Sequence, residues 1–153
     1  MIRGKIMKSL FEIEVNVPQE KLAEMFADPE NYKKWMGELE GYEIISGKPG
    51  MVGSKYRLMQ KNGDKKADFI ATVTASNLPN EFSMTIEEPD IAKVSVTGQF
   101  IALSSEKTKF ISKEEFKFKG ISNKIGGLLY QRTIKGDHHR YTMNFKHFAE
   151  NLN

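Results

Sequence analysis

The chain has 153 residues, of which 39% are hydrophobic and 28% charged, with a formal net charge of +3 and no cysteine. This length predicts a single domain over residues 1–153 that can bury a sizeable core. The lack of cysteine excludes disulfides, thiolate metal sites and a cysteine nucleophile, and no apolar run is long enough to cross a bilayer. We therefore expect a cytoplasmic protein without stable membrane insertion.

The first predicted elements are a strand over residues 10–17 and two helices. Apolar and polar side chains alternate in the strand, which is the period of a half-buried β-strand. Pro18 lacks an N–H and has a preset φ, so it ends the strand and starts a helix. The buried stripe of that helix is Leu22, Met25 and Phe26. Asp28 and Pro29 close it and cap a second short helix from Glu30 to Met36.

Six further strands are predicted between residues 41 and 118. Their ranges are 41–47, 54–60, 67–75, 81–87, 92–103 and 108–118. Turn residues separate them, and the strongest signal is Asn62-Gly63, since both residue types tolerate the positive φ that a hairpin turn requires. Connections this short leave no room for a parallel crossover, so the strands must be antiparallel.

A long helix is predicted from about Ser122 to the C-terminus. Its apolar residues recur at helical spacing: Ile125, Leu128, Leu129, Ile134, Tyr141, Phe145 and Phe148. Three glycines fall inside this predicted helix: Gly126, Gly127 and Gly136. Each destabilises a helix by about 1 kcal/mol relative to alanine. Either close packing of the helix on the sheet or a flexible lid over a cavity would explain them.

Three local features and the order of the elements resemble the START-like (SRPBCC) superfamily. The features are the segment from Pro29 to Trp35, the strand entry Val52-Gly53-Ser54 and the helix ending from Phe145 to Glu150. The resemblance implies an α+β helix-grip fold: a strongly curved antiparallel seven-stranded sheet wrapped around a long C-terminal helix, with two short helices between strands 1 and 2. It also implies that Trp35 closes one end of an internal cavity. The superfamily includes lipid carriers and polyketide cyclases and shares no catalytic residue set, so none is carried over.

The last strand offers the most informative candidate residue, Glu114. Phe110, Ser112, Glu114, Phe116 and Phe118 share one face, and the opposite face is rich in lysine. A carboxylate on the dry face must be paired, hydrated or protonated. Glu114 could orient a ligand or act as an acid or base with a raised pKa; alternatively it pairs with a helix cation such as Arg132, or a bulge turns it outward.

Other candidates for the cavity wall lie on the third predicted strand and on the last helix. Tyr56, Leu58 and Gln60 belong to the strand, and Tyr56 is either a cavity residue or an ordinary core tyrosine. His138 lies on the buried helical stripe and His139 does not, so His138 is either a proton donor or a core-edge histidine. The predicted ligand-binding residues are Trp35, Tyr56, Leu58, Phe110, Ser112, Glu114, Phe116, His138 and Tyr141.

Several function classes are set aside. No pair of histidines has the i, i+4 spacing of a zinc site, and no nucleophile elbow, Walker loop or dinucleotide fingerprint is present, so we expect no metal and no cofactor. The whole excess of positive charge falls in residues 120–153. It is spread along the predicted helix without the dense patch that nucleic acid needs, so we expect no nucleic-acid partner.

Three hypotheses for function remain. The favoured one is binding of a small hydrophobic ligand, a lipid or a polycyclic or polyketide-like metabolite, between sheet and helix. The second is an enzyme of the polyketide cyclase/dehydrase type in which Glu114, Tyr56 and His138 position and protonate a substrate. The third is a protein-interaction module with a filled interior. The chain would act as a monomer or a homodimer, and we favour a binding protein over an enzyme.

Overall fold

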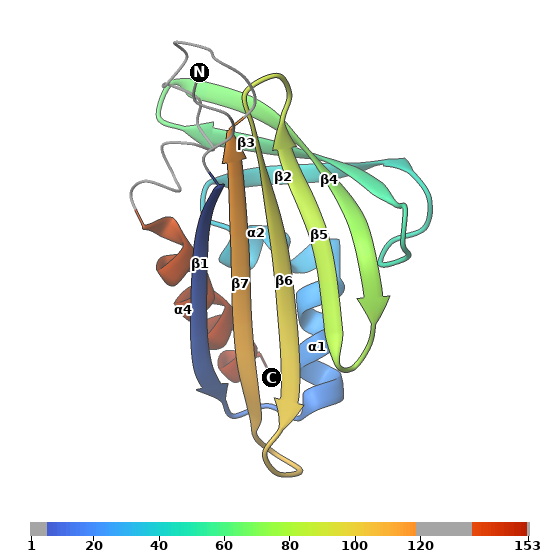
Figure 1. The fold of residues 1–153 in the computed structure, drawn as a ribbon, viewed down its shortest axis with the longest axis vertical. Helices are drawn as coiled ribbons and strands as arrows, with labels where there is room; N and C mark the ends of the chain where they lie inside the picture. Colours follow the sequence, from blue (N-terminus) through green and yellow to red (C-terminus); the bar gives the residue numbers. More distant parts are fainter. Residues whose placement is uncertain (1–5, 119–135, 153) are drawn as a thin grey trace.

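The computed structural model describes residues 6–118 and 136–152. Its strands and helices follow the predicted order (Figure 1). They are β1 (Ile6–Val15), α1 (Gln19–Ala27), the 3-10 helix η1 (Pro29–Asn31), α2 (Tyr32–Trp35), β2 (Leu39–Ser46), β3 (Lys55–Asn62), β4 (Lys65–Asn77), β5 (Glu81–Glu88), β6 (Ala92–Ala102), β7 (Thr108–Phe118) and α4 (Asp137–Asn151).

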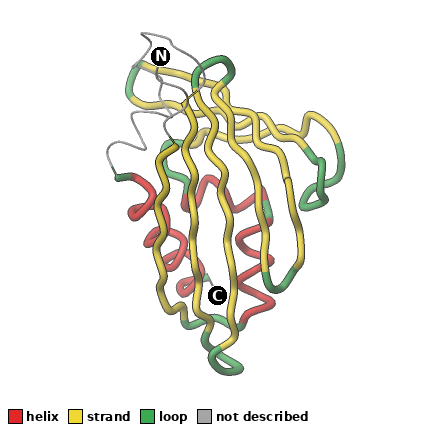
Figure 2. Tube along the Cα trace, viewed as in Figure 1, coloured by secondary structure: helices red, strands yellow, loops and turns green. Residues whose placement is uncertain are grey.

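The strands form one antiparallel sheet in the order β1-β7-β6-β5-β4-β3-β2. The sheet is curved, and α1, α2 and α4 all lie against the same face of it (Figures 1 and 2). The edges of the sheet are β1 and β2, and consecutive strands from β2 to β7 are neighbours because their connections are short. This arrangement confirms the predicted α+β helix-grip fold.

The chain enters and leaves the first helices as the sequence predicts. Pro18 is the N-cap of α1, and Asp28 caps η1 by accepting a hydrogen bond from the backbone N–H of Glu30 at 3.0 Å. The hairpin after β3 differs by one position, because Asn62 still pairs with Lys65 and the two turn residues are Gly63 and Asp64. The residue that takes a positive φ there is Gly63, at 64°.

The alternation on β7 is as predicted. Phe110, Ser112 and Phe116 are buried, and Glu114, on the same face, is partly buried. Pairing of β7 is continuous with β1 on one side and with β6 on the other, without a register shift. The alternative in which a bulge turns Glu114 outward is therefore wrong.

The start of the last helix needs a correction. Gly136 does not lie inside the helix: it is the N-cap of α4, with a left-handed φ of 75° that a right-handed helix cannot contain. Residues 119–135 lie outside the described part of the chain, and with them the predicted helical residues from Ser122 to Ile134 and the pair Gly126-Gly127.

The core between helices and sheet is centred on the ring of Phe26 in α1. Five aromatic rings surround it with centroid distances of 5.2–6.2 Å: Trp35, Phe82, Phe100, Phe110 and Phe145. These residues come from α2, three strands and α4, so one ring joins the two short helices, the sheet and the last helix.

Helix α4 is tied to the edge strand β1 and to the residue that follows it. Near its C-terminal end, Lys146 Nζ donates to the carbonyl of Glu14 at 2.6 Å, and Glu150 Oε2 accepts from the backbone N–H of Asn16 at 2.8 Å. Near its N-terminal end, the ring of Phe11 in β1 contacts the rings of His138 and His139, with centroids 4.8 and 4.9 Å away. Among the residues described, no helix combines the length and apolar character needed to span a membrane.

We predict that Gly98→Ala lowers the free energy of unfolding by about 1–3 kcal/mol. A Cβ at Gly98 in β6 would lie 2.9 Å from Cε2 of Phe26, a ring that its aromatic neighbours hold in place. Gly41→Ala is the matched control, because its Cβ would meet only Met59 Cε, at 3.5 Å. Chemical denaturation measures both variants, and equal stability of the two would contradict the packing described here.

Candidate functional site

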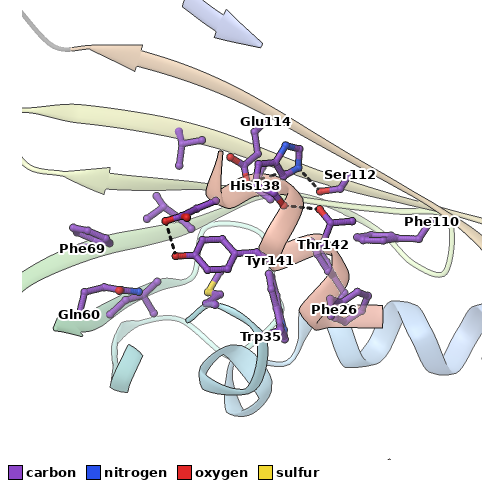
Figure 3. A pocket seen from close by; sticks show the side chains of 17 residues that line it. Phe26, Trp35, Gln60, Phe69, Phe110, Ser112, Glu114, His138, Tyr141 and Thr142 are labelled. Carbon is purple, nitrogen blue, oxygen red and sulfur yellow. Dashed lines mark hydrogen bonds and ion pairs between the residues drawn. The ribbon is translucent and has the colours of Figure 1, made fainter. Parts of the chain in front are cut away.

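A cavity of about 50 Å³ lies between the concave face of the sheet and the first turns of α4 (Figure 3). Most of its wall is apolar: Phe26, Trp35, Met36, Leu58, Phe69, Ile86, Val94, Val96, Phe110 and Phe145. The polar part of the wall consists of Gln60, Ser112, Glu114, Asp137, His138, Tyr141 and Thr142. Four of these seven come from α4, so the polar groups gather where that helix begins.

His138 is the centre of the polar part. Its Nε2 lies 2.8 Å from Ser112 Oγ and its Nδ1 lies 2.7 Å from Ser9 Oγ, so the buried imidazole bridges β7 and β1. Glu114 Oε2 is 3.8 Å from the same Nε2. The backbone carbonyl of His138 accepts a hydrogen bond from Thr142 Oγ1, one turn later, at 2.8 Å. The ring is thus fixed on both nitrogens.

The imidazole of His138 is neutral at neutral pH. Burial lowers its pKa from the ordinary 6.5 to about 4, and the charge of His139 contributes in the same direction. A neutral ring donates at one nitrogen and accepts at the other. One serine hydroxyl therefore donates to His138 and the other accepts from it.

Tyr141 forms another part of the wall next to α2. Its hydroxyl lies 3.5 Å from Asp137 Oδ2, and Arg140 pairs with Asp137 Oδ1 at 3.2 Å. The ring passes so close to Gly37 that a Cβ there would lie 2.8 Å from Tyr141 Cε1. Gly37 also has a φ of +82°, so both the space and the backbone at this position favour glycine.

One buried hydrogen-bond donor of a wall residue has no partner in the described part of the chain. Trp35 Nε1–H has no hydrogen-bond partner among the described residues, although its ring is packed on Phe26, Tyr32 and Phe145. A buried polar group without a partner is destabilising, and native proteins retain few of them. The wall residue Trp35 thus carries an indole N–H that could donate a hydrogen bond to a ligand oxygen.

Most of the residues expected in the wall are there. Trp35, Leu58, Phe110, Ser112, Glu114, His138 and Tyr141 all line the cavity. Phe116 lines a neighbouring cavity of about 220 Å³ instead, which shares Glu114 and His138 with the first. Tyr56 lines neither, because its buried hydroxyl accepts a hydrogen bond from the backbone N–H of Gly50 at 2.7 Å.

Several wall residues were not among the predicted ligand-binding set. Phe26 and Phe145 were recognised only as core positions, and Asp137 and Thr142 carry no sequence signal apart from lying one turn from His138 and Tyr141. Counting i±3 and i±4 from the two predicted helical residues would have found Asp137, Thr142 and Phe145. In the described part of the chain, no group of three or more His, Asp or Glu side chains is placed to hold a metal ion.

The curved sheet, the two short helices and α4 together define the START-like (SRPBCC) class of helix-grip proteins. Residues 10–152 match the family described as polyketide cyclase / dehydrase and lipid transport, and the chain belongs to this family. No curated protein matches the sequence significantly.

Solved structures agree on the fold. The crystal structure of Ara h 8.0201 superposes with a TM-score of 0.75 at 17% identity, covering 97% of this chain and 100% of that one. A START superfamily protein from Mycobacterium smegmatis superposes with a TM-score of 0.74 at 16% identity, covering 95% of this chain and 99% of that one. The ZhuI aromatase/cyclase from Streptomyces sp. R1128 superposes with a TM-score of 0.73 at 16% identity, covering 95% of this chain and 94% of that one.

We predict that His138 makes stability fall as the pH is lowered from 6.5 to 4. The pKa of His138 is about 4 in the folded chain, against an ordinary value of 6.5, so the unfolded chain binds more protons in this interval and is stabilised relative to the folded one. The free energy of unfolding falls by about 3 kcal/mol in total, and this decrease levels off below pH 4.

Denaturation at a series of pH values measures this effect in the native chain and in two variants. His138→Gln should flatten the profile between pH 4 and 6.5, while His147→Gln, at an exposed position further along α4, should keep it. Parallel profiles for the native chain and His138→Gln would show that the buried imidazole does not control the pH dependence.

Proposed function

We propose that this protein binds a small hydrophobic ligand in the cavity between the sheet and α4. The observation that carries the proposal is the composition of the wall: mostly apolar side chains with a few hydrogen-bonding groups, more than half of them from the first turns of α4. Ligand sites in proteins are characteristically apolar, with a few polar groups that fix orientation. The family description, polyketide cyclase / dehydrase and lipid transport, supports a ligand of this kind.

The size of the cavity sets a condition on binding. Sites for drug-sized molecules have volumes of about 300–1,000 Å³, whereas the cavity here has about 50 Å³, which is room for only a few water molecules. A lipid or polycyclic ligand must therefore displace wall side chains. Met36, an unbranched and flexible side chain in the wall, is suited to move.

The polar groups favour a ligand that carries at least one oxygen. Both nitrogens of His138 are bonded to serines, but the Ser112 hydroxyl uses only one of its hydrogen-bonding positions on His138, so it suits a ligand hydroxyl or carbonyl. The indole N–H of Trp35 is a donor only, and it suits a carbonyl or ether oxygen. Because these groups come from different parts of the wall, they would orient the ligand along the cavity.

The second candidate function is an enzyme of the polyketide cyclase/dehydrase type. The observation that favours it is the convergence of four ionisable side chains on one cavity: Glu114, Asp137, His138 and Tyr141. Since His138 is neutral at neutral pH and both its nitrogens are bonded to serine hydroxyls, it would orient Ser112 toward a substrate carbonyl without protonating that carbonyl. Glu114 would then carry the acid–base step. A third hypothesis, an interaction module with a filled interior, predicts that no ligand enters.

Uptake of a ligand should change the fluorescence of Trp35, the one tryptophan of the chain and a wall residue. We expect saturable quenching near 1:1 by at least one member of a panel of fatty acids, sterols and polycyclic aromatics. Val96→Phe, which fills the cavity from β6, should weaken binding by at least about tenfold, because the space it occupies is no longer open to the ligand. Ser95→Phe adds a similar bulk to the opposite face of β6 and should leave affinity unchanged.

Native mass spectrometry of the protein as expressed supplies the independent readout, a co-purified small molecule. If no panel member binds saturably and nothing co-purifies, the binding function is wrong and the filled-interior hypothesis gains.

Glu114→Gln separates binding from catalysis. The amide keeps the size and hydrogen-bonding capacity of the side chain and removes its acid–base function. A binding protein should retain affinity within about threefold, since a neutral acceptor remains in place. An enzyme should lose turnover of a bound polyketide-like substrate by at least about a hundredfold, as measured by product formation. A melting curve for this variant shows whether the fold itself depends on the charge.

A further inference from the structure

The loop between β2 and β3 places large apolar side chains in water. Met51 is 58% exposed and Val52 is 61% exposed, and Ile44 and Ile45 at the end of β2 are 47% and 43% exposed. The loop projects from the end of the β2–β3 pair (Figure 1). Four exposed apolar side chains thus lie within nine residues, and Met51 and Val52 are adjacent in the loop; we call this set the loop patch, and clustered exposed apolar side chains mark an interaction surface.

The loop patch is held in one conformation by its backbone. Gly53 N–H donates to the carbonyl of Val73 at 2.8 Å, and Met51 N–H donates to the carbonyl of Lys48 at 3.1 Å. Gly50 N–H donates to the buried hydroxyl of Tyr56. The exposure of Met51 and Val52 is therefore a property of an ordered turn, since the hydrogen bonds fix the segment that carries them.

The charges around the loop patch have one sign. From Ile44 to Tyr56 the chain contains Lys48 and Lys55 and no carboxylate. The acidic residue just before this stretch, Glu43, is paired with Arg57 of the neighbouring strand. Apolar side chains flanked by cations match the interface of an anionic bilayer, where apolar groups enter the headgroup region and lysines meet lipid charge.

We propose that the loop patch docks this protein on the surface of an anionic lipid bilayer. Met51 and Val52 enter the headgroup boundary, and Lys48 and Lys55 contact the anionic headgroups. Docking goes beyond the function proposed for the cavity and does not depend on it, because the patch lies on a surface loop and its assay needs no cavity ligand.

Sedimentation with large vesicles tests the proposal, using phosphatidylcholine vesicles with and without phosphatidylserine. We expect the native chain to bind the vesicles that contain phosphatidylserine and to release them as salt is raised. Met51→Ser combined with Val52→Ser should weaken binding by about tenfold or more, because both inserted side chains are lost. Lys48→Glu should also weaken it; its backbone carbonyl, which holds the loop, is retained.

The matched control is Ile101→Ser combined with Leu103→Ser. These two residues are each 45% exposed near the β6–β7 turn, far along the chain from the loop patch, and the pair should bind vesicles like the native chain. Circular dichroism and melting confirm that each variant is folded. Unchanged binding of both loop variants, or no binding of the native chain, overturns the proposal. A dimer that the loop variants abolish, without vesicle binding, also overturns it and assigns the patch to a second copy.

Discussion

Helix α4 is placed over the sheet by the ring of Phe145. This buried side chain contacts Phe26, Trp35 and Phe110 at once, with centroids 5.3, 5.4 and 5.0 Å away. Aromatic rings are large and rigid, so three simultaneous contacts leave the helix little freedom to approach the sheet or withdraw from it. The cavity lies on the N-terminal side of this contact, and the α4 residues that line it run from Asp137 to Phe145. The aromatic contact therefore determines both the spacing of the layers and where the interior stops being filled.

The two ends of the cavity differ in how their polar groups are satisfied. Toward the start of α4, His138 has a hydroxyl partner on each ring nitrogen. A fully satisfied network of this kind resists rearrangement, because moving one member exposes the others without partners. At Trp35 the situation is the opposite, since the indole donor is buried without a described acceptor. In the described part of the chain, the cavity thus has one imidazole whose hydrogen bonds are complete and one indole N–H that a ligand oxygen could satisfy.

The spacing of apolar residues along the chain and the turn residues were sufficient to predict the order of the helices and strands, the face of each β7 residue and the burial of His138. They were insufficient where long-range contacts decide. Tyr56 has the right strand, face and burial for a cavity residue, but its hydroxyl is used by the backbone of Gly50, and no local pattern encodes that partner. Gly136 carries the opposite lesson: helical spacing continues through it, while its left-handed φ marks a helix start. Phe26 was expected in a helix stripe, yet its contacts with five rings from distant parts of the chain depend on topology alone.

The attachment of α4 to the first strand has a consequence for how the chain folds. The contacts of Lys146, Glu150 and His138 with residues 9–16 join positions 129–134 apart in the sequence. All seven strands precede this helix, so the sheet can pair through mostly local hairpins, and only the β1–β7 pair and the helix require closure of a long loop. On a ribosome, the part of the concave apolar face that α4 covers would therefore stay exposed until α4 itself has emerged. The fifteen residues of α4 complete the core in the final step, and a chain ending before Asp137 would expose to solvent the apolar side chains that α4 covers, which favours aggregation.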